Sequence, residues 1–128
     1  MDNTNTRLVR LFLIGGNSMA GENSVYTWVR DHRTHHKYSE TTADPHDARR
    51  GFLFSHIGWL CVRKHPRVIS GGKTINMTDL EADPLVMFQH RHYNVFFFLF
   101  VIFLPTLVPV ILWGESVITA YFITGRIN

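Results

Sequence analysis

The stretch Tyr93–Gly114, YNVFFFLFVIFLPTLVPVILWG, decides the fold class because it has no charged residue over 22 consecutive positions. As an α-helix it would extend about 33 Å, enough to cross a hydrocarbon core of about 30 Å. Tyr93 and Trp113 lie near its ends, where aromatic side chains favour the membrane interface. Pro105 and Pro109 interrupt the run, and spanning helices tolerate proline. The stretch therefore predicts a transmembrane helix rather than a buried segment of a soluble core.

The charges are unevenly distributed around this stretch. Residues 1–92 contain 12 of the 13 basic and 9 of the 10 acidic residues, and all eight histidines lie between His32 and His92. The net charge of +3 is too small for a typical nucleic-acid-binding protein, so no nucleic-acid partner is expected. Basic residues concentrate before the stretch, which places the histidine-rich segment in the cytosol by the positive-inside rule. They are Arg49, Arg50, Arg63, Lys64, Arg67, Lys73 and Arg91.

A second motif, Asp31-His-Arg-Thr-His-His-Lys37, carries three histidines. On a helix, His32, His35 and His36 share one face because they are spaced i, i+3 and i+4. Neutral imidazole is a good ligand for iron, zinc or copper, so the spacing predicts a metal site and leaves zinc and iron open. The alternative is a solvated basic face, because arginine and lysine alternate with the histidines.

The segments after this motif have several interpretations. Asp44 and His46 either orient the imidazoles or cap a helix. The aromatic stretch 49–60, RRGFLFSHIGWL, is typical of a helix lying on a membrane surface. Arg63 and Lys64, which follow it, either bind a phosphorylated ligand or lipid head groups or simply anchor the chain at the interface. Thr78 is expected to cap a short helix, with Glu81 at its third position.

Residues 28–68, WVRDHRTHHKYSETTADPHDARRGFLFSHIGWLCVRKHPRV, resemble the membrane acyl-CoA desaturases, most closely the stearoyl-CoA (delta-9) type. Further blocks agree: NSMAGENSVY (17–26), TDLEADPLVMFQ (78–89), LPTLVP (104–109) and LWGES (112–116). The resemblance implies a multi-pass protein of the endoplasmic reticulum membrane with four spanning helices and a cytosolic cap. It implies a di-iron, oxygen-dependent enzyme that converts a saturated fatty acyl-CoA into a cis-monounsaturated one. Electrons would come from NADH through cytochrome b5 reductase and cytochrome b5.

The same resemblance implies the fold class and the division of the chain. An all-α membrane protein is expected, carrying part of a four-helix desaturase fold. Residues 1–22 would be the end of the second spanning helix, which includes the short apolar stretch Leu11–Ile14. Residues 23–92 would be the cytosolic cap, 93–114 the third spanning helix, and 115–128 a lumenal turn and the start of the fourth.

Site residues follow by the same comparison. His32, His35 and His36 match the second histidine box and would be iron ligands. The residues that match substrate-binding positions, including the surface that holds coenzyme A, are Asn23, Trp28, Arg30, Asp31, Trp59, Arg63 and Lys64.

The chain also departs from the family pattern. The family's first box, HxxxxH, does not occur before His32, and no second HxxHH motif occurs anywhere. Three imidazoles are too few for two irons, so the chain is expected to be an incomplete portion that is inactive alone. Two other interpretations remain open. One is a short, catalytically inactive form that binds the membrane and another desaturase chain, and the other is a small zinc-binding membrane protein.

Overall fold

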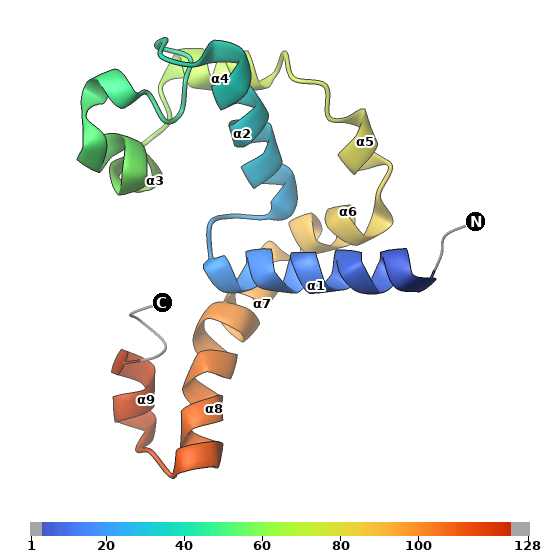
Figure 1. Cartoon of the computed structure of the whole chain (residues 1–128), viewed down its shortest axis with the longest axis vertical. Coiled ribbons are helices and arrows are strands. Elements are labelled where there is room, and N and C mark those ends of the chain that lie inside the picture. The colour runs from blue at the N-terminus through green and yellow to red at the C-terminus, as the bar shows by residue number, and fades with distance from the viewer. Residues whose placement is uncertain (1–3, 124–128) are drawn as a thin grey trace. The chain divides into compact units, whose positions relative to one another are not determined.

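The computed structural model describes residues 4–123, and across these residues it is helical with no β-strand (Figure 1). This confirms the all-α prediction. The helices are α1 (Thr4–Ala20), α2 (Val25–Tyr38), the 3₁₀ turn η1 (Ala48–Arg50), the π-helix η2 (Phe54–Gly58), α3 (Trp59–Cys61), α4 (Pro66–Gly72), α5 (Thr78–Glu81), α6 (Pro84–Arg91), α7 (Tyr93–Phe97), the π-helix η3 (Phe98–Phe103), α8 (Leu104–Trp113) and α9 (Val117–Ile123).

The chain divides into two compact units. The first combines the residues up to Val25 with those from Pro84 onward, and the second comprises Tyr26–Asp83. Helices α1, α6, α7, η3, α8 and α9 form the first unit, whereas the second unit contains the histidine motif.

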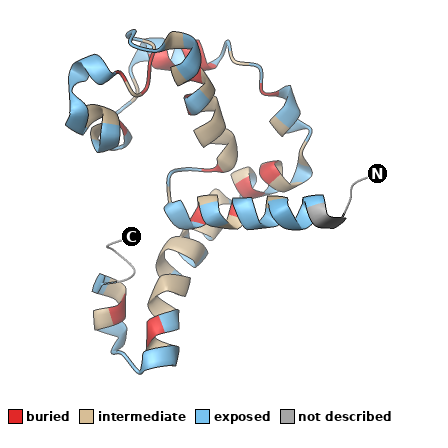
Figure 2. Cartoon of the chain, viewed as in Figure 1, coloured by how far each residue is buried: buried red, intermediate tan, exposed pale blue. Residues whose placement is uncertain are grey.

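In the first unit, α7, η3 and α8 follow one another without a break and form the predicted membrane-length helix. Its bounds are Tyr93–Trp113, its most apolar window has a mean hydropathy of 2.8, and it is the one helix of the described residues that meets the length and composition of a membrane span. Helix α1 packs against α6, α7 and η3. After Gly114, which adopts a left-handed conformation with φ 68°, α9 turns back along α8 (Figure 1). Burial is sparse in this unit (Figure 2).

The middle of this helix is not α-helical. Residues Phe98–Phe103 form a π-helix, and Pro105 follows within the first turn of α8. Proline lacks a backbone N–H, and π-helical turns commonly occur where the regular ladder is interrupted. The Thr106 hydroxyl donates to the carbonyl of Ile102 at 2.7 Å, which supplies an additional hydrogen bond at this interruption.

The connection between α1 and α2 is held by side chains from α6. Gly21 adopts a φ of 69°, a left-handed conformation that favours glycine, and a Cβ there would make only an ordinary contact with Val101 at 3.4 Å. Gln89 is fully buried and accepts a hydrogen bond from the backbone N–H of Val25 at 3.1 Å. Its amide nitrogen donates to the Ser18 hydroxyl at 3.2 Å. Gln89 therefore stabilises the first turn of α2.

In the second unit, α2 packs against α4 at two adjacent glycines. A Cβ on Gly71 would lie 3.1 Å from the Tyr38 ring, and one on Gly72 would lie 3.7 Å from the Thr34 hydroxyl. Asp31 and Thr34 on the facing side of α2 are 3% and 1% exposed. The close approach of the two helices thus depends on side chains being absent at this point of α4.

Two local predictions need correction. Thr78 does not cap α5, because its own N–H and hydroxyl both donate to Oδ1 of Asn76, which provides the cap instead. The stretch 49–60 is not one regular helix. It begins as the 3₁₀ turn η1, passes through the π-helix η2 and ends in α3, with Gly51 at φ 97° separating the first two.

Candidate functional site

Two of the three motif histidines converge on α2. Nε2 of His32 lies 3.1 Å from Nε2 of His36, one turn later on the helix. The Trp28 ring stacks on His32 with a centroid distance of 4.8 Å and an interplanar angle of 13°. Desolvation, followed by the charges of His36 and His35, lowers the pKa of His32 below its usual value. This environment favours the neutral form of His32.

The third histidine is oriented by a buried carboxylate. Nδ1 of His35 lies 2.8 Å from Oδ1 of Asp44, whose side chain is 1% exposed. The same carboxylate accepts the backbone N–H groups of Glu40 and His46 at 2.9 and 2.8 Å. The His46 ring packs between His35 and Trp59, with centroid distances of 5.1 and 4.1 Å, and burial lowers its pKa. Asp44 thus fixes both the loop and the ring orientation of His35.

This arrangement matches the chemistry of a metal site only in part. Neutral imidazoles, one of them oriented by a carboxylate, are typical metal ligands. Among the described residues, however, no group of three or more His, Cys, Asp or Glu side chains is arranged to hold a metal ion. The donor atoms that converge are the Nε2 atoms of His32 and His36. A metal at this pair would need further ligands.

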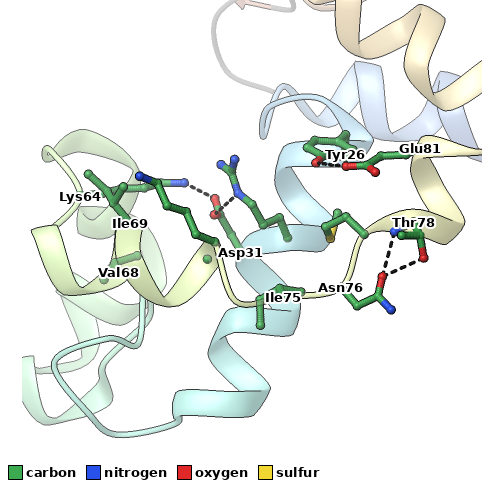
Figure 3. A pocket seen from close by; sticks show the side chains of 13 residues that line it. Tyr26, Asp31, Lys64, Val68, Ile69, Ile75, Asn76, Thr78 and Glu81 are labelled. Atoms are coloured by element: carbon green, nitrogen blue, oxygen red, sulfur yellow. Dashed lines mark hydrogen bonds and ion pairs between the residues drawn. The ribbon is translucent and has the colours of Figure 1, made fainter.

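Beside the histidines, the same helix borders a cavity of about 470 Å³ (Figure 3). The buried Asp31 carboxylate pairs with the ammonium group of Lys64 and lies 3.7 Å from Nε of Arg30. Lys73 adds another cation to the lining, and the Tyr26 hydroxyl donates to Glu81 at 3.0 Å. Burial, followed by the Glu81 hydrogen bond, raises the pKa of Tyr26. The cavity therefore combines three basic side chains with two acidic ones.

Arg33 holds one wall of this cavity in place. Its guanidinium donates to both carboxylate oxygens of Asp79, at 2.8 and 2.6 Å, and to the carbonyl of Asn76 at 2.8 Å. Asn76, Met77 and Thr78 line the cavity. The hydrogen bonds from Arg33 are the main reason that the pKa of Asp79 falls to about 2.

A second, smaller cavity of about 260 Å³ lies on the other side of Lys64, which lines both. Trp59 and Arg63 contribute to it, together with Arg50 and the carboxylates of Asp44 and Asp47. Trp59 is 8% exposed, so its ring forms the buried wall.

The structure brings most of the predicted site residues together. Arg30, Asp31 and Lys64 share the larger cavity, and Trp59 and Arg63 share the smaller one with Lys64. Trp28 contacts His32, as described above. Asn23 belongs instead to the turn between α1 and α2, where it has a φ of 79° and its backbone N–H donates to the Tyr93 hydroxyl at 3.0 Å.

Sequence reasoning missed several residues that shape the site. Tyr26 lies one helical turn before Arg30, so the i, i+4 spacing was an available signal. Arg33 was considered only as part of a basic face. No local pattern identifies the contributions of Lys73, Asn76 and Met77, because they depend on how the segment after α4 returns to α2.

The fold and site define a helical protein with one membrane-length helix and an imidazole-bearing helix that borders a charged cavity. No family model matches the chain. It is 57% identical over 120 residues to an acyl-CoA desaturase of Cyprinus carpio and 61% identical over 108 residues to stearoyl-CoA desaturase 4 of Mus musculus. It is 56% identical over 115 residues to the stearoyl-CoA desaturase of Homo sapiens.

The chain belongs to the acyl-CoA desaturase family. The three matches cover 94%, 84% and 90% of this chain, and 37%, 31% and 32% of the respective relatives. The chain therefore spans about a third of the length of the curated relatives that it matches.

Proposed function

We propose that this chain provides part of the active site of an acyl-CoA desaturase that introduces a cis double bond into a saturated fatty acyl-CoA at the delta-9 position. The observation that carries the proposal is the composition of α2. One turn of this helix contributes Arg30 and Asp31 to a charged cavity, and the adjoining residues His32 and His36 bring two imidazole nitrogens within 3.1 Å. A ligand site and a metal-ligand pair thus lie next to each other on one element.

The larger cavity suits the coenzyme A portion of the substrate. Arg30, Lys64 and Lys73 supply positive charge for its phosphates. Asp31 fixes the Lys64 ammonium group by a buried ion pair and can accept hydrogen bonds from the ligand. Trp59 and Arg63, in the adjoining cavity, would contact the ligand beyond Lys64. Trp28 and Asn23 are proposed to lie along the acyl chain.

His32, His35 and His36 would be iron ligands, with Asp44 orienting His35 from behind. Bound iron, with dioxygen as the oxidant, would supply the oxidising power needed to remove two hydrogen atoms from an unactivated acyl chain. The role of this chain is to hold the imidazoles in position, and the lowered pKa of His32 favours its neutral, metal-binding form. The remaining ligands would come from segments that the longer relatives possess, so this chain alone is proposed to be inactive.

The membrane arrangement follows the same proposal. Tyr93–Trp113 would be the third spanning helix of a multi-pass protein of the endoplasmic reticulum, with α1 at the end of the second and α9 at the start of the fourth. The excess of basic residues before the span supports a cytosolic position for the histidine-bearing segment. There it would be accessible to cytochrome b5 and its NADH-dependent reductase, the proposed electron donors.

A chimera tests this proposal. Residues 4–123 replace the matching segment of the carp acyl-CoA desaturase, and the chimera is expressed in desaturase-deficient yeast supplied with stearate. Gas chromatography should detect a delta-9 monounsaturated product, and His36→Ala should abolish it together with most of the bound iron. A chimera that folds and binds iron but produces no double bond would contradict the proposed function. Zinc in place of iron would favour a zinc-binding protein.

A further inference from the structure

The segment from Arg49 to Arg67 exposes an apolar surface that nothing else in the described chain covers. Leu53, Ile57 and Leu60 lie along η2, α3 and the residue directly before η2. They are 75%, 53% and 42% exposed, and the neighbouring Phe52 is 80% exposed. Trp59, next to Leu60, is buried. The segment thus combines one buried ring with several exposed large hydrophobic side chains.

The exposed apolar side chains lie in a basic part of the sequence. Residues 48–78 contain six basic residues and no aspartate or glutamate. Arg50 stacks its guanidinium 3.5 Å from the centre of the Phe54 ring, and Arg67 donates to the neutral hydroxyl of Thr42 at 2.9 Å. The contact of Arg67 with a neutral hydroxyl leaves its charge available to an anion, whereas the charge of Arg50 also acts on Asp47, whose pKa it helps to lower. Arg49 differs, because Asp47 pairs with it at 2.9 Å.

From this juxtaposition we propose that Phe52, Leu53, Ile57 and Leu60 insert into the surface of an anionic phospholipid bilayer, with Arg50 and Arg67 contacting its head groups. An apolar face rimmed by arginine and lysine is the chemistry that binds such a surface, because hydrophobic insertion and attraction to anionic lipid act together. The same chain also contains a helix of membrane length, Tyr93–Trp113. The inference is independent of the proposed desaturase activity, since it involves neither iron nor acyl-CoA.

Depth-dependent fluorescence quenching tests this proposal. The full chain carrying Cys61→Ser and Leu53→Cys is labelled with the fluorophore NBD and reconstituted into phosphatidylcholine vesicles that contain 30% phosphatidylserine. Lipids with a nitroxide near the head group should quench the label at least twofold more strongly than they quench a label at Ser39→Cys. Ser39 is the matched control because it is also exposed and lies in the same unit, after α2 and outside the segment proposed to contact lipid.

Two further readings complete the test. Arg50→Gln with Arg67→Gln should remove the dependence of quenching on phosphatidylserine while leaving the circular dichroism spectrum unchanged, because both side chains are exposed. Equal quenching at positions 53 and 39 would overturn the proposal. A label at 53 shielded from both lipid nitroxide and aqueous iodide would also overturn it, because a protein surface would then cover this face.

Discussion

The side chain of Gln89 accepts a hydrogen bond from the backbone N–H of Val25 across 64 residues of sequence, at 3.1 Å. The first N–H groups of a helix have no partner within the helix itself. Here the partner comes from α6, and the same side chain also satisfies the Ser18 hydroxyl of α1. One buried amide thus links the last turn of α1 and the first residue of α2 to α6.

Gln89→Ala should reduce the free energy of unfolding of the first unit by about 2 kcal/mol, because it removes the acceptor of the half-buried Val25 N–H and a donor to the buried Ser18 hydroxyl, and it creates a cavity. Thermal unfolding in detergent, followed by circular dichroism, measures the change. Arg91→Ala is the matched control, since Arg91 is exposed at the end of the same helix. Equal midpoints for the two variants would contradict the role assigned to Gln89.

Lys64→Gln should weaken the binding of coenzyme A about tenfold, equivalent to about 1.4 kcal/mol. Lys64 borders both cavities and pairs with the buried Asp31, so the substitution removes a cation from the ligand site. Isothermal titration calorimetry with coenzyme A checks this, and affinity should also fall as salt rises. Lys37→Gln makes the same change of charge on α2 outside both cavities, so it should bind coenzyme A normally.

Asp44→Asn should lower the iron content of the chimera roughly tenfold, since carboxylates that orient a metal-binding imidazole typically contribute 10–100-fold in affinity. Asp44 touches Nδ1 of His35, whereas Asp47 pairs with Arg49. Asp47→Asn is therefore the comparison, and its iron content should remain near that of the unsubstituted chimera. Plasma emission spectrometry of purified protein provides the measurement. Similar losses in both variants would indicate general destabilisation instead.

The Asp79 carboxylate should remain ionised far into the acid range. Its pKa is about 2 in the folded chain, against an ordinary value of 3.8, because Arg33 donates two hydrogen bonds to it. The unfolded chain therefore binds the proton more readily, so the stabilisation from this pair is fully present above about pH 4 and is lost as pH falls toward 2. Carbon-detected NMR titration measures the carboxyl directly.

Arg33→Gln should return the pKa of Asp79 toward its ordinary value. The wall formed by Asn76–Thr78 should then become more mobile, because the same guanidinium also holds the Asn76 carbonyl. An unchanged Asp79 titration in this variant would show that Arg33 is not the cause of the low pKa.

Regular periodicity explains which parts of the fold the sequence could predict. The uncharged run predicted the span to within one residue at its end, and the i, i+3, i+4 histidines predicted a helix that the structure places at Val25–Tyr38. The π-helical turns escaped prediction, since hydrophobic composition does not distinguish hydrogen bonding to the fourth residue from bonding to the fifth. Asn76 was missed as a cap because Thr78 is an equally good capping residue by type.

Only part of the candidate site could be predicted from the sequence, for a related reason. Asp44 was weighed equally as an imidazole partner and as a helix cap, and only the folded loop shows its carboxylate against His35. Gln89 lies 64 residues from Val25, so no local pattern links them. Contacts of this kind depend on tertiary packing. No spacing of residues along a single sequence reveals them.

The π-helical stretch within the span also affects which membranes suit this helix. Twenty-one residues in a regular α-helix would cover about 31 Å, close to the thickness of a plasma membrane rich in sterols. Phe98–Phe103 forms wider turns, so these residues advance less along the axis than α-helical ones would. The hydrophobic length is consequently shorter than the residue count suggests. Hydrophobic matching therefore favours a thinner bilayer. The mismatch with a thicker bilayer, such as a sterol-rich plasma membrane, would disfavour transport of the protein to that membrane.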